Sequence, residues 1–160
     1  MRWGLILVFV LIVQSGFCQQ FEKEMSVYIQ GGIGLPTGMF SSIYKLTLNG
    51  KVGLQYDISP KTNLVAETGF MYFFKKNKPG GISFIPLTGG IEYEAAPDTQ
   101  ASIQIGGALL ADRPVQIYFA VQPGVAYNFT EHTSLKLDYT GFVSYGYVVG
   151  GLNLSYRYRL

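Results

Sequence analysis

Charged residues are scarce in this chain, and cysteine and histidine each occur once. Asp, Glu, Lys and Arg together make up 14% of the 160 residues, and the formal net charge is +2. The few basic residues are scattered along the sequence, so they do not form the dense positive face of a nucleic-acid-binding protein. We therefore expect no DNA or RNA partner.

Long hydrophobic runs are also missing after the first residues of the chain. A membrane-spanning helix needs roughly 20 consecutive apolar residues, and no stretch beyond residue 18 meets that requirement. If the mature chain crosses a membrane, it must do so as a closed sheet, because only helices and closed barrels satisfy all their backbone hydrogen bonds in lipid.

The first 18 residues have the three parts of a secretory signal peptide. Arg2 gives a positive start, Gly4 to Val13 is apolar, and a short polar tail ends at Cys18. We predict cleavage between Cys18 and Gln19, which leaves a mature chain without cysteine and so excludes disulfides, thiol catalysis and cysteine metal sites.

Two alternatives exist for this leader. A transmembrane anchor is disfavoured because the apolar run has only about half the length that a spanning helix needs. A lipoprotein signal, with Cys18 as the lipidated residue, is disfavoured because the bulky Phe17 precedes the cysteine where small residues are expected.

An alternation of apolar and polar residues recurs through the rest of the chain and is clearest in the final segment. There Leu152, Leu154, Tyr156, Tyr158 and Leu160 alternate with Asn153, Ser155, Arg157 and Arg159. A period of two is typical of a strand with two unlike faces. The alternation does not decide whether the apolar face points inward, as in a soluble barrel, or outward to lipid.

Eight segments are predicted as strands, and turn-forming residues separate them. They are residues 26–35, 46–58, 63–75, 82–94, 100–110, 115–129, 134–144 and 147–160. Short connections and an even strand number describe an all-β, eight-stranded antiparallel up-and-down transmembrane β-barrel with both chain ends on one side. Residues 19–160 are thus predicted to form a single barrel domain.

The turns of this barrel are predicted to alternate between its two ends. Those at Pro60, Pro97 and His132 are placed with the chain termini on the periplasmic side, and the segments near Phe40, Pro79, Asp112 and Gly146 face outward. Among the outward segments, only Pro36 to Lys45 is long enough to offer a small recognition surface.

Charged residues on the polar face are predicted to gather near the periplasmic end. They are the acids Asp57, Glu67, Glu92, Glu94 and Asp138 and the bases Lys136, Arg157 and Arg159. Inside a narrow barrel these groups could form an ion-pair lattice that offsets the cost of their desolvation. The alternative is that they are surface charges of an ordinary sheet.

Aromatic residues on the apolar face are predicted to form two girdles, as in a membrane barrel. Tyr56, Tyr93, Tyr127, Tyr139, Tyr156 and Tyr158 are placed on the periplasmic side, and Phe70, Tyr72, Phe74 and Phe119 toward the outer side. The alternative is that they form the core of a sandwich, because strands are generally rich in Tyr and Phe.

Three segments of the chain resemble the small outer-membrane β-barrel proteins of Gram-negative bacteria, of the eight-stranded OmpA/OmpX-like kind. They are residues 30–38, 85–93 and 156–160. The resemblance implies an outer-membrane location, contact with outer-membrane lipids, and recognition of the last strand by the barrel assembly machinery. Tyr156, Tyr158 and Leu160 match the alternating terminal signal of that family, although Leu160 stands where an aromatic residue is common.

Residues with catalytic potential do not form a convincing site. The lone His132 lies in a predicted turn, at the opposite end from Ser41, Ser42 and Ser144. Glu92 and Glu94 could act as an acid/base pair or hold Ca²⁺, but with Arg157 and Arg159 nearby a structural ion pair is favoured. Gly31 to Gly34 precedes no helix and is not a phosphate loop. We therefore identify no catalytic, cofactor-binding or metal-ligating residue and expect no cofactor.

The sequence favours a non-enzymatic barrel with a structural or surface-interaction role in the cell envelope, and with an unidentified extracellular or envelope protein as partner. Three alternatives remain open. They are a narrow porin-like channel for small solutes, a lipid-modifying barrel enzyme using His132, and a soluble lipocalin-like lipid-binding barrel whose apolar residues would point inward.

Overall fold

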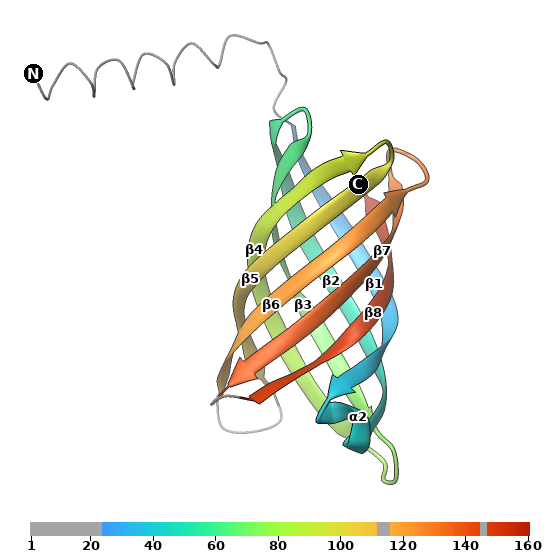
Figure 1. Ribbon diagram of the computed structural model, residues 1–160, viewed down its shortest axis with the longest axis vertical. Coiled ribbons are helices and arrows are strands. Elements are labelled where there is room, and N and C mark those ends of the chain that lie inside the picture. Colours follow the sequence, from blue (N-terminus) through green and yellow to red (C-terminus); the bar gives the residue numbers. More distant parts are fainter. Residues whose placement is uncertain (1–23, 112–115, 145–146) are drawn as a thin grey trace, which may run out of the picture.

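The computed structural model describes residues 24–111, 116–144 and 147–160, which form a closed barrel of eight antiparallel strands (Figure 1). The predicted leader at residues 1–18 lies outside the described residues. The elements are β1 (Met25–Gly38), α2 (Phe40–Ile43), β2 (Tyr44–Ser59), β3 (Thr62–Lys75), β4 (Gly81–Ala96), β5 (Thr99–Leu110), β6 (Ile117–Asn128), β7 (Thr133–Ser144) and β8 (Tyr147–Arg159). Each strand pairs with its neighbours in sequence, and β8 pairs with β1. The prediction of an all-β, eight-stranded up-and-down barrel is confirmed.

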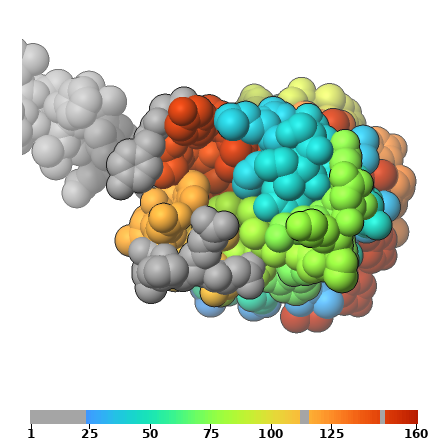
Figure 2. Space-filling model, turned by 90° about the horizontal axis from the view of Figure 1, so that it is seen from below, coloured from blue at the N-terminus to red at the C-terminus, as the bar shows by residue number. Residues whose placement is uncertain are grey.

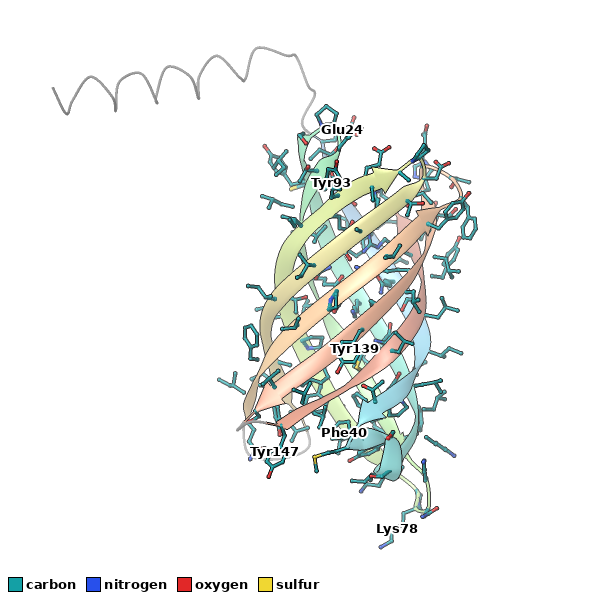
Figure 3. All side chains as sticks on the ribbon, viewed as in Figure 1. Glu24, Phe40, Lys78, Tyr93, Tyr139 and Tyr147 are labelled. Atoms are coloured by element: carbon teal, nitrogen blue, oxygen red, sulfur yellow. The ribbon has the colours of Figure 1, made fainter. Side chains whose placement is uncertain are left out.

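The barrel has two distinct ends. Glu24 marks the end where the described chain begins and where β8 finishes, which we call the terminal end (Figure 3). Phe40 and Lys78 mark the opposite end, which carries the short helix α2 and the β3–β4 hairpin and which we call the α2 end. The predicted alternation of connections between two ends is therefore confirmed for the described hairpins.

The first strand is longer than the sequence predicted. Residues 26–35 were expected to form it, but β1 continues to Gly38 because its last residues pair with β8, with Pro36 opposite Gly151 and Gly38 opposite Val149. Pairing with β2 has already ended at Gly34. Proline removes one backbone donor, but at this point β1 has only one neighbour to satisfy, so the strand is not interrupted.

This extension shortens the predicted recognition segment, Pro36 to Lys45. Only residues 39–43 remain between the strands, and four of them form α2. The Ser41 and Ser42 hydroxyls donate to the carbonyl oxygens of Gly38 and Met39, each at 2.8 Å, which holds the helix against the end of β1. The connection between β1 and β2 is therefore a short helix packed against the strand end and not an extended loop.

The two faces of the barrel wall differ sharply in polarity. Exposed apolar side chains project outward from all eight strands, for example Ile33 in β1, Leu87 in β4 and Ile105 in β5, each more than half exposed. The buried side chains that point inward include many polar and charged groups, such as Gln104 and Lys136. A lipocalin-like barrel requires the reverse arrangement, so the structure disagrees with that alternative. Within the described ranges, no helix is both long and apolar enough to cross a membrane.

Candidate functional site

The inward-facing charges nearest the terminal end centre on Glu92 of β4. Arg157 of β8 donates to this carboxylate from both ends of its guanidinium, with Nη1 2.9 Å from Oε2 and Nη2 2.7 Å from Oε1. The Lys136 ammonium of β7 lies 3.4 Å from Oε1 of the same carboxylate. Strand β4 lies across the barrel from the paired strands β7 and β8, so these side chains connect opposite walls through the lumen.

A second group of inward-facing charges lies deeper and centres on Glu67 of β3. Its carboxylate accepts from the Lys51 ammonium at 2.9 Å, from the Gln122 amide at 2.6 Å and from the Tyr28 hydroxyl at 2.9 Å. The Tyr28 ring also lies under the Arg157 guanidinium, 4.1 Å from ring centroid to Cζ. Tyr28 therefore links the two groups into one network.

Charge is balanced within this network. Among the described residues six charged side chains are buried, namely the acids Glu67, Glu92 and Asp138 and the bases Lys51, Lys136 and Arg157. Asp138 accepts from the Thr140 hydroxyl at 2.9 Å and from the Asn153 amide at 3.3 Å, and it lies 3.8 Å from the Lys51 ammonium. Equal numbers of opposite charges offset the large cost of burying each one alone.

The predicted ion-pair lattice is thus present, but its membership differs from the prediction. Glu67 and Asp138 lie near the middle of their strands and not near the terminal end. Asp57, Glu94 and Arg159 are only half-buried at the rim, where Arg159 donates to Gln55 at 3.0 Å. The expected pairing of Glu92 with Arg157 is confirmed.

The sequence reading missed two members of the network, Lys51 and Tyr28. Lys51 was not included in the predicted ion-pair lattice, because that prediction took only charges near the strand ends. Its place in the alternation nevertheless puts it on the polar face of its strand. Tyr28 shares a face with Gln30, between the apolar Val27 and Ile29. That position on the polar face was the available signal for an inward-pointing tyrosine.

Toward the α2 end the lumen changes from polar to apolar. The buried cluster there consists of Tyr44, Met71, Phe73, Phe84, Ala108, Leu110, Ala120 and Phe142. The rings of Phe84 and Phe142 stack with centroids 4.3 Å apart and planes inclined by 9°. Phe40 of α2 packs on this cluster from outside, 5.0 Å from the Phe73 ring, so the helix caps the barrel interior at this end.

This apolar plug was not predicted, since the lumen was expected to hold charged side chains. The signal that could have predicted the plug lies in residues 70–74. There Met71 and Phe73 occupy alternate positions on the same face of β3 as Glu67, but both are apolar. Together, the plug and the charged network fill the described interior with side chains, as expected for a barrel of only eight strands. This arrangement counts against the narrow-channel alternative.

Aromatic side chains on the outward face follow the predicted girdles with one exception. Tyr56, Tyr93, Tyr127, Tyr156 and Tyr158 are exposed on the segments nearest the terminal end, and Phe70 and Phe119 are exposed toward the α2 end. Tyr139 was assigned to the terminal end, but it lies below the middle of the barrel toward the α2 end (Figure 3). Its position near the centre of β7 accounts for the error.

The residues of the enzyme alternative lie far apart. His132 is exposed in the β6–β7 hairpin at the terminal end, where its Nδ1 lies 3.2 Å from the Arg159 carbonyl oxygen. Ser41 and Ser42 lie in α2 at the other end, so neither serine is near the histidine. In the described part of the chain no group of three or more His, Cys, Asp or Glu residues could hold a metal ion.

Comparisons with known proteins agree with this architecture. No protein-family model matches the chain, and no curated protein matches it in sequence. The crystal structure of Ail from Yersinia pestis aligns with a TM-score of 0.63 at 14% identity, covering 88% of this chain and all of Ail. The N-terminal barrel of Pseudomonas aeruginosa OprF aligns with a TM-score of 0.61 at 14% identity, covering 87% of this chain and all of that barrel. The chain has the fold of the small eight-stranded outer-membrane β-barrels.

A designed protein shares this outer-membrane barrel fold. A de novo transmembrane β-barrel aligns with a TM-score of 0.56 at 18% identity, covering 84% of this chain and 95% of the design. A de novo designed sequence thus reaches a similar fold. The similarity therefore reports how the chain is built and does not identify what it binds.

Proposed function

We propose that this chain is an integral outer-membrane β-barrel with a non-enzymatic, structural or surface-interaction role in the envelope of a Gram-negative bacterium. The observation that carries the proposal is the inverted distribution of polarity, with apolar side chains outward on all eight strands and balanced charges inside. In water so large an apolar exterior would be costly, at roughly 25 cal/mol per Å². In a bilayer the same surface is satisfied by lipid.

Heat-modifiability tests this proposal. The full chain is expressed in a Gram-negative host, the outer-membrane fraction is extracted in mild detergent, and gel mobility is compared before and after boiling. We expect a folded band that shifts on boiling and is confined to the outer-membrane fraction. Recovery of a monomer that is soluble without detergent would overturn the proposal.

We also propose that outer-membrane lipids and the barrel assembly machinery are partners of this chain. Tyr156 and Tyr158 are exposed on the outward face of β8 and Leu160 is exposed directly after it, so all three are accessible to the machinery. Replacing Tyr158 with Asn should slow insertion in cells, because it removes one apolar position of the terminal signal, while the same change at Tyr147 at the other end of β8 should not. Equal insertion of both variants would argue against recognition through β8.

The narrow channel is the second candidate function, because charged side chains do line the lumen. We expect no conductance in planar bilayers, since the apolar plug fills the lumen at the α2 end. If currents are seen, replacing Glu67 or Arg157 should alter them, because these groups lie in the path. Stable currents that respond to those two replacements would favour the channel over the structural barrel.

A further inference from the structure

Exposed charge is distributed very unevenly between the two ends of the barrel. Among the described residues at the α2 end, the charged side chains are Lys45, Lys75, Lys76 and Lys78, with no acid beside them. The terminal end carries the acids Glu24, Asp57, Glu94, Asp98 and Glu131 and the bases Lys61 and Arg159. We call the first group the outer-rim lysines.

The local backbone brings three of the outer-rim lysines, Lys45, Lys75 and Lys76, to the same part of the rim. Tyr44 pairs with Lys75 and Leu46 pairs with Phe74, so Lys45 is the extra residue of a β-bulge directly beside Lys75. The Lys76 backbone N–H donates to the Ile43 carbonyl oxygen at 3.0 Å, and its ammonium donates to the Ser41 carbonyl oxygen at 2.6 Å. Like charges on neighbouring positions of a sheet repel each other, and a bound anion would relieve that repulsion.

The height of these lysines on the barrel points to the source of the anion. Tyr72 and Phe74 form an edge-to-face pair on the outward face of β3, with centroids 4.7 Å apart, and outward aromatic residues of this kind sit at the lipid headgroup level. The outer-rim lysines lie one to four residues beyond Phe74 or its partner Leu46, at about 3.3 Å per residue. The headgroup layer is roughly 5–8 Å thick on each side, so the ammonium groups reach lipid phosphates.

Apolar side chains next to the lysines favour a lipid over a water-soluble polyanion. Met39 directly precedes α2 and is 59% exposed, and Ile43 is the last residue of α2 and is 52% exposed. Figure 2 shows α2 and the start of β2 in cyan directly beside the β3–β4 hairpin in green on this face. A surface that combines cations with exposed apolar groups matches a molecule with a phosphate headgroup and acyl chains.

We propose that the outer-rim lysines form a binding surface for the phosphate groups of anionic lipids in the outer leaflet. This inference rests on the proposed function, because it requires the barrel to be inserted in a membrane. The surface recruits lipid by charge and by depth in the bilayer. It involves neither the buried network nor the terminal end.

Lipid selectivity in vesicles tests this binding surface. The full chain is reconstituted in phosphatidylcholine vesicles containing a spin-labelled phosphatidic acid or a spin-labelled phosphatidylcholine, and the motionally restricted fraction of each label is measured. We expect the wild type to prefer phosphatidic acid several-fold, and high salt to weaken that preference. Replacing all four outer-rim lysines with Gln should abolish the preference.

A matched pair of single replacements controls for a general loss of charge. Lys78→Gln and Lys61→Gln each remove one exposed hairpin lysine, at the α2 end and the terminal end respectively. Lys78→Gln should reduce the several-fold preference without abolishing it, because three outer-rim lysines remain, and Lys61→Gln should leave it unchanged. Boiling-dependent gel mobility shows that each variant has inserted and folded.

Three outcomes would overturn this proposal. They are no lipid preference in the inserted wild type, an unchanged preference in the inserted fourfold variant, and equal losses for Lys61→Gln and Lys78→Gln. Binding of sucrose octasulfate to the detergent-solubilised protein without any lipid preference would assign the lysines to a soluble polyanion instead. A chain that fails to insert at all would contradict the proposed membrane location and not this binding surface.

Discussion

Arg157 donates two hydrogen bonds to the Glu92 carboxylate, from Nη1 at 2.9 Å and from Nη2 at 2.7 Å, inside a barrel whose outer surface is apolar. The two residues are far apart in sequence and lie on β8 and β4, so their contact crosses the lumen. Because two parallel hydrogen bonds join the planar guanidinium to the carboxylate, they fix the relative orientation of the two groups as well as their separation.

Replacing Arg157 with Ala should destabilise the barrel by about 3–5 kcal/mol, because it leaves the Glu92 carboxylate buried without its main partner. Arg157→Lys should recover only part of this loss, since an ammonium cannot reproduce the fork. Urea unfolding in phosphatidylcholine vesicles measures both variants. Arg159→Ala is the control, because Arg159 lies at the half-buried rim. Equal effects of Arg157→Ala and Arg159→Ala would contradict the prediction.

Lys51 and Glu67 should show strong energetic coupling, because their charged atoms are 2.9 Å apart and both side chains are buried. Lys51→Met and Glu67→Gln should each destabilise the barrel, while the double variant should lose less than the sum of the two. The difference is expected to be about 0.5–3 kcal/mol. A double-mutant cycle from urea unfolding gives this value, and strict additivity would mean that the two groups act independently.

Phe142→Ala should remove about 3–5 kcal/mol of stability, because it opens a cavity beside the stacked Phe84 ring in the apolar plug. Phe119→Ala, which removes a half-exposed ring from the outward face, serves as the matched control and should cost less. Unfolding midpoints in vesicles compare the two variants. A larger loss at Phe119 would show that the plug contributes little to stability.

Gly53→Ala should destabilise the barrel by about 1–3 kcal/mol, since a Cβ at this position would overlap the Tyr28 ring and hydroxyl. Tyr28 cannot move aside easily, because its hydroxyl donates to Glu67 and its ring lies under Arg157. Gly107→Ala is the control, because the nearest atoms to its Cβ are 3.8 and 4.0 Å away. Similar unfolding curves for the two variants would contradict a tight contact at Gly53.

The strands could be predicted from sequence because period-two alternation is a local signal. The largest error was at the end of the first strand, predicted at residue 35 and found at Gly38. There the deciding factor was pairing with β8, which is distant in sequence. Alternation also placed Glu92, Lys136 and Arg157 together on the polar face, although it did not decide which of the two faces points inward.

The contents of the lumen were less predictable for two physical reasons. Which inward residues meet across a barrel depends on the stagger of its strands, so the contacts of Tyr28 with Glu67 and Arg157 could not be read from parity. In residues 70–74 both faces of the strand are apolar, so the sequence pattern does not distinguish the inward face from the outward face where the plug begins. Helix α2 is four residues long and too short for a helical period.

The seam between β1 and β8 joins the first and last strands of the barrel, with Tyr28 opposite Arg159 and Gly38 opposite Val149. Because β8 is the last of the eight strands, the sheet can close only after residues 147–159 have been synthesised. A product truncated before β8 would expose two unpaired strand edges, which invite association with other chains. Premature termination or clipping before β8 should therefore yield aggregates and substrates for proteolysis, and not a smaller working barrel.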